Sequence, residues 1–362
     1  MKNVISLGAQ IKSGFSVISP DGLYSLAPGG DLEDIENYNG FETAVRGYLR
    51  DNGITPDIIA CDMHPDYRST YLAEDLSREY KGADLVRVQH HFAHIAACML
   101  DNDIDGEVIG VSFDGTGYGD DGKSWGGEFM LATRSGYRRR YHLDYVPQPG
   151  GDAASREGWR MAAAYLAKAY GDGFMEAFAP FTERVGGEKI AAVKEMMEKE
   201  INCPLTSSMG RLFDAVASLT GLCDVSEFEA EGAILLEKTA DDNTKGYYDI
   251  DIAGSRVSVY PMIKQIVEDM KSGTASGVIS ARFHNTIGEM ICRVSGLIRE
   301  ETGVDTVLLS GGCFQNKYLL RYAEDRFRAS GLKLYSHKKY SPTDLGISVG
   351  QAVIAATIED QT

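Results

Sequence analysis

The sequence lacks the features of a cysteine-stabilised or membrane-bound protein. Its six cysteines are far apart and include no Cys-x-x-Cys pair, which argues against a zinc ribbon or a disulfide scaffold. Most lie in apolar surroundings, so we expect reduced core thiols in a reducing cytosol. No stretch approaches the roughly 20 consecutive apolar residues of a membrane helix. The N-terminus lacks the pattern of a signal peptide. We therefore expect a cytoplasmic protein that does not enter a membrane.

Positive charge is also scarce, because 36 Lys and Arg face 53 Asp and Glu for a formal charge of −17. Such a surface repels a phosphate backbone and disfavours nucleic-acid binding unless the fold hides a basic patch. The only basic run is Arg138-Arg139-Arg140, which we expect on an exposed strand or turn. The sequence contains no Walker-type phosphate loop and no Gly-x-Ser-x-Gly nucleophile elbow. Nothing marks one of the cysteines as a nucleophile.

What is present is a chain of 362 residues with 43% hydrophobic residues and 40 glycines. This length suits one large domain or two modest ones with a substantial core. Strands alternate with helical patterns along most of the chain, which predicts an α/β fold.

Two segments share one pattern and suggest an internal duplication. Residues 4–17 read as strand, glycine-bearing turn and strand. Residues 108–133 repeat this order, with Asp114–Gly119 as a glycine-rich turn. Two halves that each open with a β-hairpin favour the actin-like ATPase plan, with a ligand cleft between two lobes. We place the first lobe at residues 1–102 and the second at 103–362, with a helical insert at about 150–275.

A histidine pair is the strongest chemical signal. His90 and His94 are four residues apart in a helical stretch, so both imidazoles lie on one helix face and can reach the same ion. The alternative is one core histidine with two on the surface. Two histidines are an incomplete site, and we expect a carboxylate from elsewhere. Asp114 and Asp344 are the natural candidates.

Two glycine-rich segments follow buried strands, where α/β proteins bind ligands. Backbone amides of Asp114-Gly115-Thr116-Gly117 can cradle a phosphate, and the aspartate can hold a metal; the alternative is an ordinary hairpin turn. Ser310-Gly311-Gly312 lets a ligand approach the backbone, and Asn316 follows in the same segment. The nucleotide-binding candidates from both segments are Gly115, Thr116, Gly117, Gly311, Gly312 and Asn316.

Four further polar residues are candidates for the same cleft. Asp152 fits a helix N-cap, or alternatively binds a ribose or the transferred group. Arg211 and Asp214 lie near one another on an expected helix, as a local ion pair or as nucleotide ligands. His64 follows the strand at residues 58–61 and can hydrogen-bond a substrate. We assign His64 and Asp114 as the catalytic candidates.

Taken together, several long motifs resemble the C-terminal transferase region of the HypF-type carbamoyltransferases of hydrogenase maturation, over the whole length of the chain. The motifs that carry this resemblance are Val88–Ala97, Phe113–Gly119, Trp125–Glu128, Pro149–Ala154, Ser208–Asp214 and Leu309–Gly312. The resemblance implies an actin-like (ASKHA), duplicated fold related to the tRNA threonylcarbamoyl transferases.

The resemblance also implies a reaction. In this family a carbamoyl group arrives as carbamoyl adenylate and passes to the C-terminal cysteine thiol of the partner HypE, which supplies cyanide for the iron of [NiFe] hydrogenase. It implies His90, His94 and Asp344 as metal ligands, with Asp114 near the metal and the phosphate. The metal can be iron, zinc or magnesium, and the nucleotide ATP, AMP or carbamoyl adenylate.

The chain departs from the family pattern in several places. The acylphosphatase-like, zinc-finger and adenylate-forming domains are not in this sequence, so a separate domain or protein must supply carbamoyl adenylate. Glu229–Gly232 replaces an expected Glu-Gly-Gln-Ala, Gln10 replaces Glu, and Ser13-Gly14 replaces Asn-Thr. Two alternatives therefore stay open. One is carbamoyl or threonylcarbamoyl transfer to a small-molecule hydroxyl or tRNA, and the other is a non-catalytic actin-like nucleotide-binding module.

Overall fold

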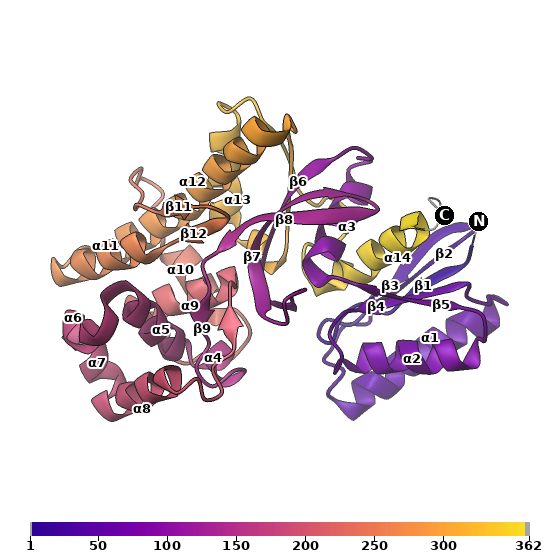
Figure 1. The fold of residues 1–362 in the computed structure, drawn as a ribbon, viewed down its shortest axis with the longest axis horizontal. Helices are drawn as coiled ribbons and strands as arrows, with labels where there is room; N and C mark the ends of the chain where they lie inside the picture. Colours follow the sequence, from indigo (N-terminus) through magenta and orange to yellow (C-terminus); the bar gives the residue numbers. More distant parts are fainter. Residues whose placement is uncertain (1, 359–362) are drawn as a thin grey trace.

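The computed structural model describes residues 2–358, which form an elongated body around two β-sheets (Figure 1). The first sheet has the order β3-β2-β1-β4-β5. Its first three strands are antiparallel neighbours, and β4 and β5 continue the sheet parallel to β1. The strands are β1 (Val4–Ser6), β2 (Phe15–Ser19), β3 (Gly22–Leu26), β4 (Ile58–Asp62) and β5 (Asp84–Val88).

Two amphipathic helices cover one face of this sheet, α1 (Ile35–Asp51) and α2 (Arg68–Glu79). Their buried side chains recur at helical spacing, as the sequence predicts, and pack against alternate strand residues such as Ile5 and Ile59. Asp34 caps the N-terminus of α1, because its side chain accepts hydrogen bonds from two first-turn amides, at 2.8 and 3.0 Å.

The second sheet repeats the topology of the first. Its central order is β8-β7-β6-β13-β14, with the same succession of antiparallel and parallel neighbours. The predicted duplicated, two-lobed α/β fold is therefore confirmed. The strands are β6 (Val108–Tyr118), β7 (Ser124–Thr133), β8 (Gly136–Leu143), β13 (Thr306–Ser310) and β14 (Lys333–Tyr335), with β11 (Asp251–Ala253) and β12 (Arg256–Ser258) at the β8 edge and β9 (Val146–Pro147) and β10 (Leu205–Thr206) beside β7.

Helices α3 (His90–Asp101) and α14 (Ile347–Ile358) pack against each other between the two sheets. Helix α3 contacts β6, β7 and β13, whereas α14 contacts β1, β2 and β4. Helix α3 is buried along nearly its whole length, which suits a helix enclosed between two layers. The C-terminal helix thus returns to the first sheet. The lobe boundary at residues 102 and 103 stays a prediction.

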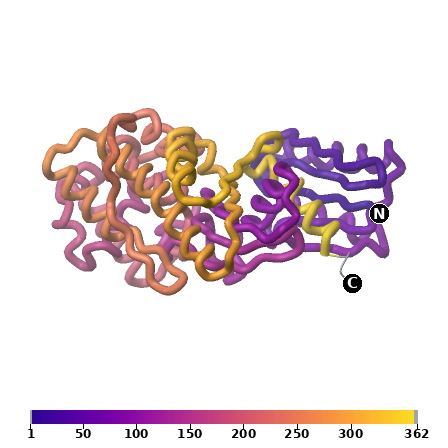
Figure 2. The backbone as a smooth tube through the Cα atoms, turned by 90° about the horizontal axis from the view of Figure 1, so that it is seen from above, coloured from indigo at the N-terminus to yellow at the C-terminus, as the bar shows by residue number. Residues whose placement is uncertain are grey.

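A mainly helical region forms the end of the molecule opposite the first sheet (Figure 2). It includes the residues of the predicted insert, whose bounds stay a prediction, and it shares one large apolar core with the second sheet. Its helices are α4 (Ala153–Arg156), α5 (Gly158–Tyr170), α6 (Phe174–Ala177), α7 (Ala179–Val185), α8 (Gly187–Glu198), α9 (Met209–Leu219), α10 (Glu231–Thr239) and α11 (Tyr260–Lys271), and α12 (Ser276–Thr302) and α13 (Lys317–Phe327) follow. The 3₁₀ helices are η1 (Gly171–Gly173), η2 (Gly312–Gln315) and η3 (Asp344–Gly346).

The glycine-rich segment after Phe113 is not the predicted turn. Strand β6 continues through it to Tyr118, and the chain reverses only between Gly119 and Ser124. The pairing register with β7 shifts between Phe113 and Gly117, which marks a β-bulge. Glycine tolerates such irregular strand geometry, and a bulge re-aims the side chains within it.

The basic run lies on β8, as predicted, but it is not uniformly exposed. Arg138 is 66% exposed, whereas Arg139 is 16% exposed and pairs with the fully buried Glu128 at 2.6 Å. Arg139 thus joins a structural ion pair. None of the helices within residues 2–358 is long and apolar enough to cross a membrane.

Candidate metal centre

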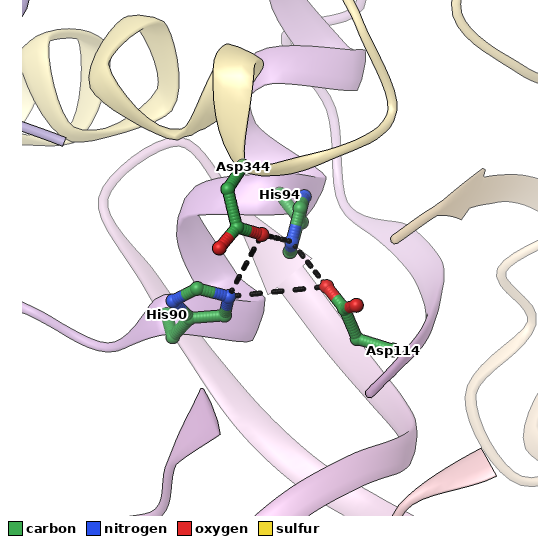
Figure 3. A group of neighbouring side chains, drawn as sticks. All are labelled: His90, His94, Asp114 and Asp344. Atoms are coloured by element: carbon green, nitrogen blue, oxygen red, sulfur yellow. Dashed lines mark hydrogen bonds and ion pairs between the residues drawn. The ribbon is translucent and has the colours of Figure 1, made fainter. Parts of the chain in front are cut away.

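Four side chains from three parts of the chain converge between the two lobes (Figure 3). His90, His94, Asp114 and Asp344 each offer one donor atom, and these atoms all lie within 4.8 Å of one another. His94 Nε2 lies 2.8 Å from Asp114 Oδ2 and 3.7 Å from Asp344 Oδ1. His90 Nε2 lies 3.8 and 3.6 Å from the same two carboxylates. The structure thus brings together the four residues that the sequence proposes as ligands.

Helix α3 supplies both imidazoles from its first turns. Gln89 caps this helix, because its side-chain oxygen accepts a hydrogen bond from Phe92 N at 2.8 Å. The helical period then places His90 and His94 one turn apart, with ring centroids 5.0 Å apart. His91 points elsewhere, since its Nδ1 lies 3.1 Å from the side-chain nitrogen of Gln89.

The bulge in β6 presents Asp114 to the histidines. Asp114 Oδ1 accepts a hydrogen bond from Gly115 N at 2.7 Å, which leaves Oδ2 facing His94. Gly312 lies alongside, where an added Cβ would be 3.1 Å from Asp114 Oδ1. Ser208 Oγ lies 2.8 Å from the Asp114 carbonyl oxygen and ties the bulge to the start of α9.

Asp344 lies on the segment that joins β14 to α14. Gly311 N donates to the carbonyl oxygen of Pro342 at 3.0 Å, which joins this segment to the end of β13. Asp101, at the C-terminal end of α3, accepts from the amides of Lys338, Lys339 and Tyr340. Helix α3 therefore carries two candidate ligands at one end and anchors the approach to a third at the other.

The charges of the cluster reinforce one another. Burial by itself lowers the pKa of His90, but Asp344, Asp114 and Asp62 together raise this pKa well above its ordinary value. Burial likewise opposes ionisation of Asp114, yet His90 and His94 hold its pKa well below the usual range. The carboxylates of Asp62, Asp114 and Asp344 thus place negative charge at the site, and nearby positive charge is needed to balance it.

The donor set suits a metal ion. His90 Nε2 is buried and has no hydrogen-bond partner among the described residues, although it faces two carboxylates. A buried polar atom without a partner is uncommon, and coordination of a metal ion would satisfy this nitrogen. Two imidazole nitrogens and two carboxylate oxygens are ordinary ligands of zinc and iron.

His64 and Asp152 lie near enough for the Asp152 carboxylate to act on the pKa of His64. His64 stacks on Tyr67, with ring centroids 4.1 Å apart, and packs edge-on against Tyr118. Burial lowers the pKa of His64, and the carboxylates of Asp62, Asp66 and Asp152 oppose this effect. Asp152 stands at the N-cap of α4 without a capping side-chain bond, so the predicted capping role is wrong.

Arg211 and Asp214 form the predicted ion pair, but in a buried setting. Arg211 Nη2 lies 2.7 Å from Asp214 Oδ2, and Arg211 Nη1 hydrogen-bonds Ser155 Oγ. Arg211 Nε lacks a hydrogen-bond partner within residues 2–358, so the guanidinium has spare capacity for a ligand. Burial raises the pKa of Asp214 despite the guanidinium.

Cys313 lies among these charged groups but is not poised as a nucleophile. Burial, followed by the charge of Asp114, raises the pKa of its thiol well above the ordinary value. The thiol therefore stays protonated, in agreement with the sequence, where nothing marks a nucleophilic cysteine.

Two of the nucleotide candidates are engaged elsewhere. Thr116 is exposed, and its hydroxyl lies 3.0 Å from that of Ser124. Asn316 is buried, caps α13 through Leu319 N at 2.9 Å and donates to His284 Nε2 at 2.8 Å. The side chain of Asn316 is therefore committed to the protein interior. The described geometry gives it a structural role.

The sequence offers the segment Asp62–Tyr67 as one that could line the ligand cleft, but it gives Asp62 and Tyr67 no role of their own beside the cluster. Asp62 Oδ2 lies 2.8 Å from His90 Nδ1, and the carboxylates of Asp62 and Asp344 both act on the pKa of Tyr67. The available signal was a carboxylate at the carboxyl end of a buried strand, where α/β proteins place functional groups.

Two protein-family models match the chain, and their matched residues include the four residues of the cluster. The model described as "HypF Kae1-like domain" matches residues 1–101. The model described as "Carbamoyltransferase, Kae1-like Domain, second subdomain" matches residues 110–351, well over half of the chain.

The chain belongs to the HypF carbamoyltransferase family.

Individual proteins of the HypF family are similar to this chain over nearly its whole length. Carbamoyltransferase HypF2 of Cupriavidus necator is 34% identical over 98% of this chain and 46% of its own length. The chain thus spans about half the length of several relatives that it matches. A carbamoyltransferase HypF homolog of the same organism is 34% identical over 98% of this chain and 91% of its own length. A tRNA N6-adenosine threonylcarbamoyltransferase of Dictyoglomus turgidum is 26% identical over 41% of the chain.

A solved HypF structure has the same fold. The chain is similar to the crystal structure of full-length HypF in the phosphate- and nucleotide-bound form, with 34% identity and a TM-score of 0.93. The match covers 99% of this chain and 55% of the HypF chain. The predicted resemblance to HypF is therefore confirmed for both the sequence and the fold.

Proposed function

We propose that this chain is a metal-dependent carbamoyltransferase. It moves the carbamoyl group of carbamoyl adenylate to the C-terminal cysteine thiol of a HypE-like partner, in the pathway to the cyanide ligand of [NiFe] hydrogenase. A separate adenylate-forming domain or protein supplies the donor. The observation that carries the proposal is the convergence of His90, His94, Asp114 and Asp344 in a chain of the HypF family.

The four residues hold a metal ion in this proposal, and iron or zinc fits them better than magnesium. Magnesium prefers oxygen ligands and retains waters, whereas imidazole suits iron and zinc. When bound, the ion supplies a Lewis acid that polarises a carbonyl or phosphoryl oxygen. The protein fixes its ligands on a buried helix and a strand bulge.

Groups near the cluster can bind the nucleotide part of the donor. Arg211 lies beside the Gly115 backbone, where an added Cβ would be 3.9 Å from Arg211 Nη2, and its Nε has no hydrogen-bond partner in the described structure. A guanidinium and open glycine backbone suit phosphate oxygens. The homologous HypF structure was solved with phosphate and nucleotide bound, which supports a nucleotide site in this fold.

His64 is placed to act as a hydrogen-bond donor. Its Nδ1 accepts from Asp66 N at 3.2 Å, so the proton of the neutral ring is on Nε2. Burial lowers the pKa of His64 and favours this neutral form. A donor of this kind stabilises the negative charge that develops on the carbamoyl oxygen.

The proposed transfer balances without an internal nucleophile. The partner thiolate forms a bond from sulfur to the carbamoyl carbon, and the bond from that carbon to the adenylate oxygen breaks, releasing AMP. The proton of the acceptor thiol passes to solvent or buffer before attack. The products are an S-carbamoylated cysteine and AMP.

The test uses mass spectrometry of acceptor peptides incubated with the chain and carbamoyl adenylate. We expect carbamoylation of a peptide ending in cysteine but not of the same peptide ending in serine. His94→Ala should abolish both metal content and transfer, whereas Asp75→Asn, an exposed change in the first lobe, should retain both. Modification of the serine peptide or of a small hydroxyl would instead support another acceptor. Nucleotide and metal binding without turnover would favour a non-catalytic module.

A further inference from the structure

A fifth charged side chain touches the metal-centre residues without belonging to the ligand group. Asp62 is completely buried at the carboxyl end of β4. Its Oδ2 lies 2.8 Å from His90 Nδ1, and its Oδ1 accepts from His64 N at 2.9 Å. Both carboxylate oxygens therefore bond protein groups. Removing a carboxylate fully from water is costly unless hydrogen-bond partners compensate for the lost hydration. His90 and the His64 amide are these partners for Asp62.

The sheet register holds Asp62 beside the start of α3. Asp62 pairs with Val88 in the parallel ladder of β4 and β5, and Met63 N donates to the Val88 carbonyl oxygen at 3.2 Å. Gln89 then caps α3, and His90 is the first residue of the helix. The distance from Asp62 to His90 is thus set by the backbone pairing of two strands.

The contact decides which nitrogen of His90 faces the cluster. An ionised carboxylate only accepts hydrogen bonds, so it requires a proton on His90 Nδ1. His90 Nε2 is then left toward Asp114 and Asp344, and it is the buried nitrogen without a hydrogen-bond partner in the described structure. A carboxylate behind a ligating imidazole fixes the tautomer and ring orientation and makes the other nitrogen more basic.

We infer that Asp62 is a positioning residue of the metal centre, which holds the proton of His90 on Nδ1 and presents Nε2 to the ion. This inference rests on the proposed metal site. Asp62 also has a second role, because it holds the segment that follows β4. Asp62 joins the His64 amide to His90, so one carboxylate aligns a candidate ligand and the candidate substrate donor.

The test measures zinc affinity of the full chain by competition with a chelator, for wild type, Asp62→Ala, Asp62→Asn and Asp75→Asn. We expect Asp62→Ala to lose about 10- to 100-fold in affinity. Asp62→Asn should lose less, because its amide oxygen still accepts from Nδ1–H without a charge. Asp75→Asn removes the same charge from an exposed site and should bind as wild type does. Circular dichroism reports folding, and Asp62→Asn alone carries the test if Asp62→Ala does not fold.

A second readout distinguishes positioning from general stabilisation. Long-range ¹H–¹⁵N spectra of the zinc-loaded protein should show the proton of His90 on Nδ1 in wild type, and this signal should broaden or shift in Asp62→Ala. Zinc affinity and spectra equal to wild type in both Asp62 variants would overturn the inference, while His90→Ala still lost the metal. A wild-type chain that binds neither zinc nor iron would overturn the proposed metal site and this inference together.

Discussion

Helix α14 crosses helix α3 where Gly350 lies against Ala93. A Cβ at Gly350 would lie 1.8 Å from the carbonyl oxygen of Ala93, so only glycine fits this crossing. Ala93 stands between His90 and His94 in the sequence, and α14 begins just after Asp344. The close crossing therefore sets the distance between the imidazoles and the carboxylate that the C-terminal segment brings to them.

Gly350→Ala should destabilise the protein by about 3 kcal/mol or more, because a methyl group cannot overlap a backbone oxygen without moving a helix. Metal affinity should fall as well, since Asp344 moves with α14. Denaturant unfolding and metal titration measure the two effects. Gly296→Ala is the matched control, because a Cβ there meets open space within α12 and should stabilise by about 0.5 to 1 kcal/mol. Equal stability of Gly350→Ala and wild type would contradict this packing argument.

Asp101→Ala should loosen the segment that leads to Asp344. Asp101 is buried, and three backbone amides donate to it, which lowers its pKa against the opposing effect of burial. Removing the carboxylate leaves these amides without their acceptor. We expect faster hydrogen exchange at Lys338, Lys339 and Tyr340, and weaker metal binding. Asp105→Ala, at an exposed acid near the same helix end, should change neither. Unchanged exchange in Asp101→Ala would show that other contacts hold the segment.

His284 should make stability depend on pH. Burial lowers its pKa from the ordinary 6.5 to about 4, so the folded state binds the proton more weakly than the unfolded chain. Its stabilising contribution is thus complete above about pH 6.5 and is lost as the pH falls toward about 4. Between about pH 7.5 and about pH 5 the loss is about 2 kcal/mol.

Chemical denaturation at these two pH values tests this dependence. His284→Leu should show a difference in unfolding free energy smaller by about that amount. Its stability at the higher pH should also drop, because Asn316 Nδ2 loses its acceptor. The same pH dependence in wild type and His284→Leu would exclude His284 as its source.

Ala230→Gly should stabilise the protein. Ala230 has a φ of 60°, a left-handed conformation that costs an alanine about 1 kcal/mol relative to glycine. It precedes α10 at an exposed position, where burial of its methyl group does not offset this cost. Ala192→Gly, at an exposed position inside α8, should instead destabilise by about 1 kcal/mol. Thermal unfolding of both variants compares the signs, and two losses would contradict the prediction.

Much of the fold was predictable because its signals are local. The helical stretch of His90 and His94 is the start of α3, and the repeated strand–glycine–strand order indicated the duplication that the two sheets show. The role of the segment at Asp114 was predictable in part. Its glycines suggested a turn, but pairing with β7 extends the strand through them and leaves a bulge. Residue preferences alone do not distinguish a hairpin turn from a bulge, because both favour glycine.

The candidate site was likewise predictable from the sequence only in part. The sequence by itself determined that His90 and His94 share a helix face, since a period of 3.6 residues follows from the backbone. It also offered Asp114 and Asp344 as the candidate carboxylates, and the family resemblance pointed to the same two residues. Only the tertiary structure decided that Asp62 lies behind His90 and that Asp101 anchors the segment before Asp344. These contacts arise from the register of β4 with β5 and the crossing of α3 with α14. Such pairings join residues distant in the chain, and no local period encodes them.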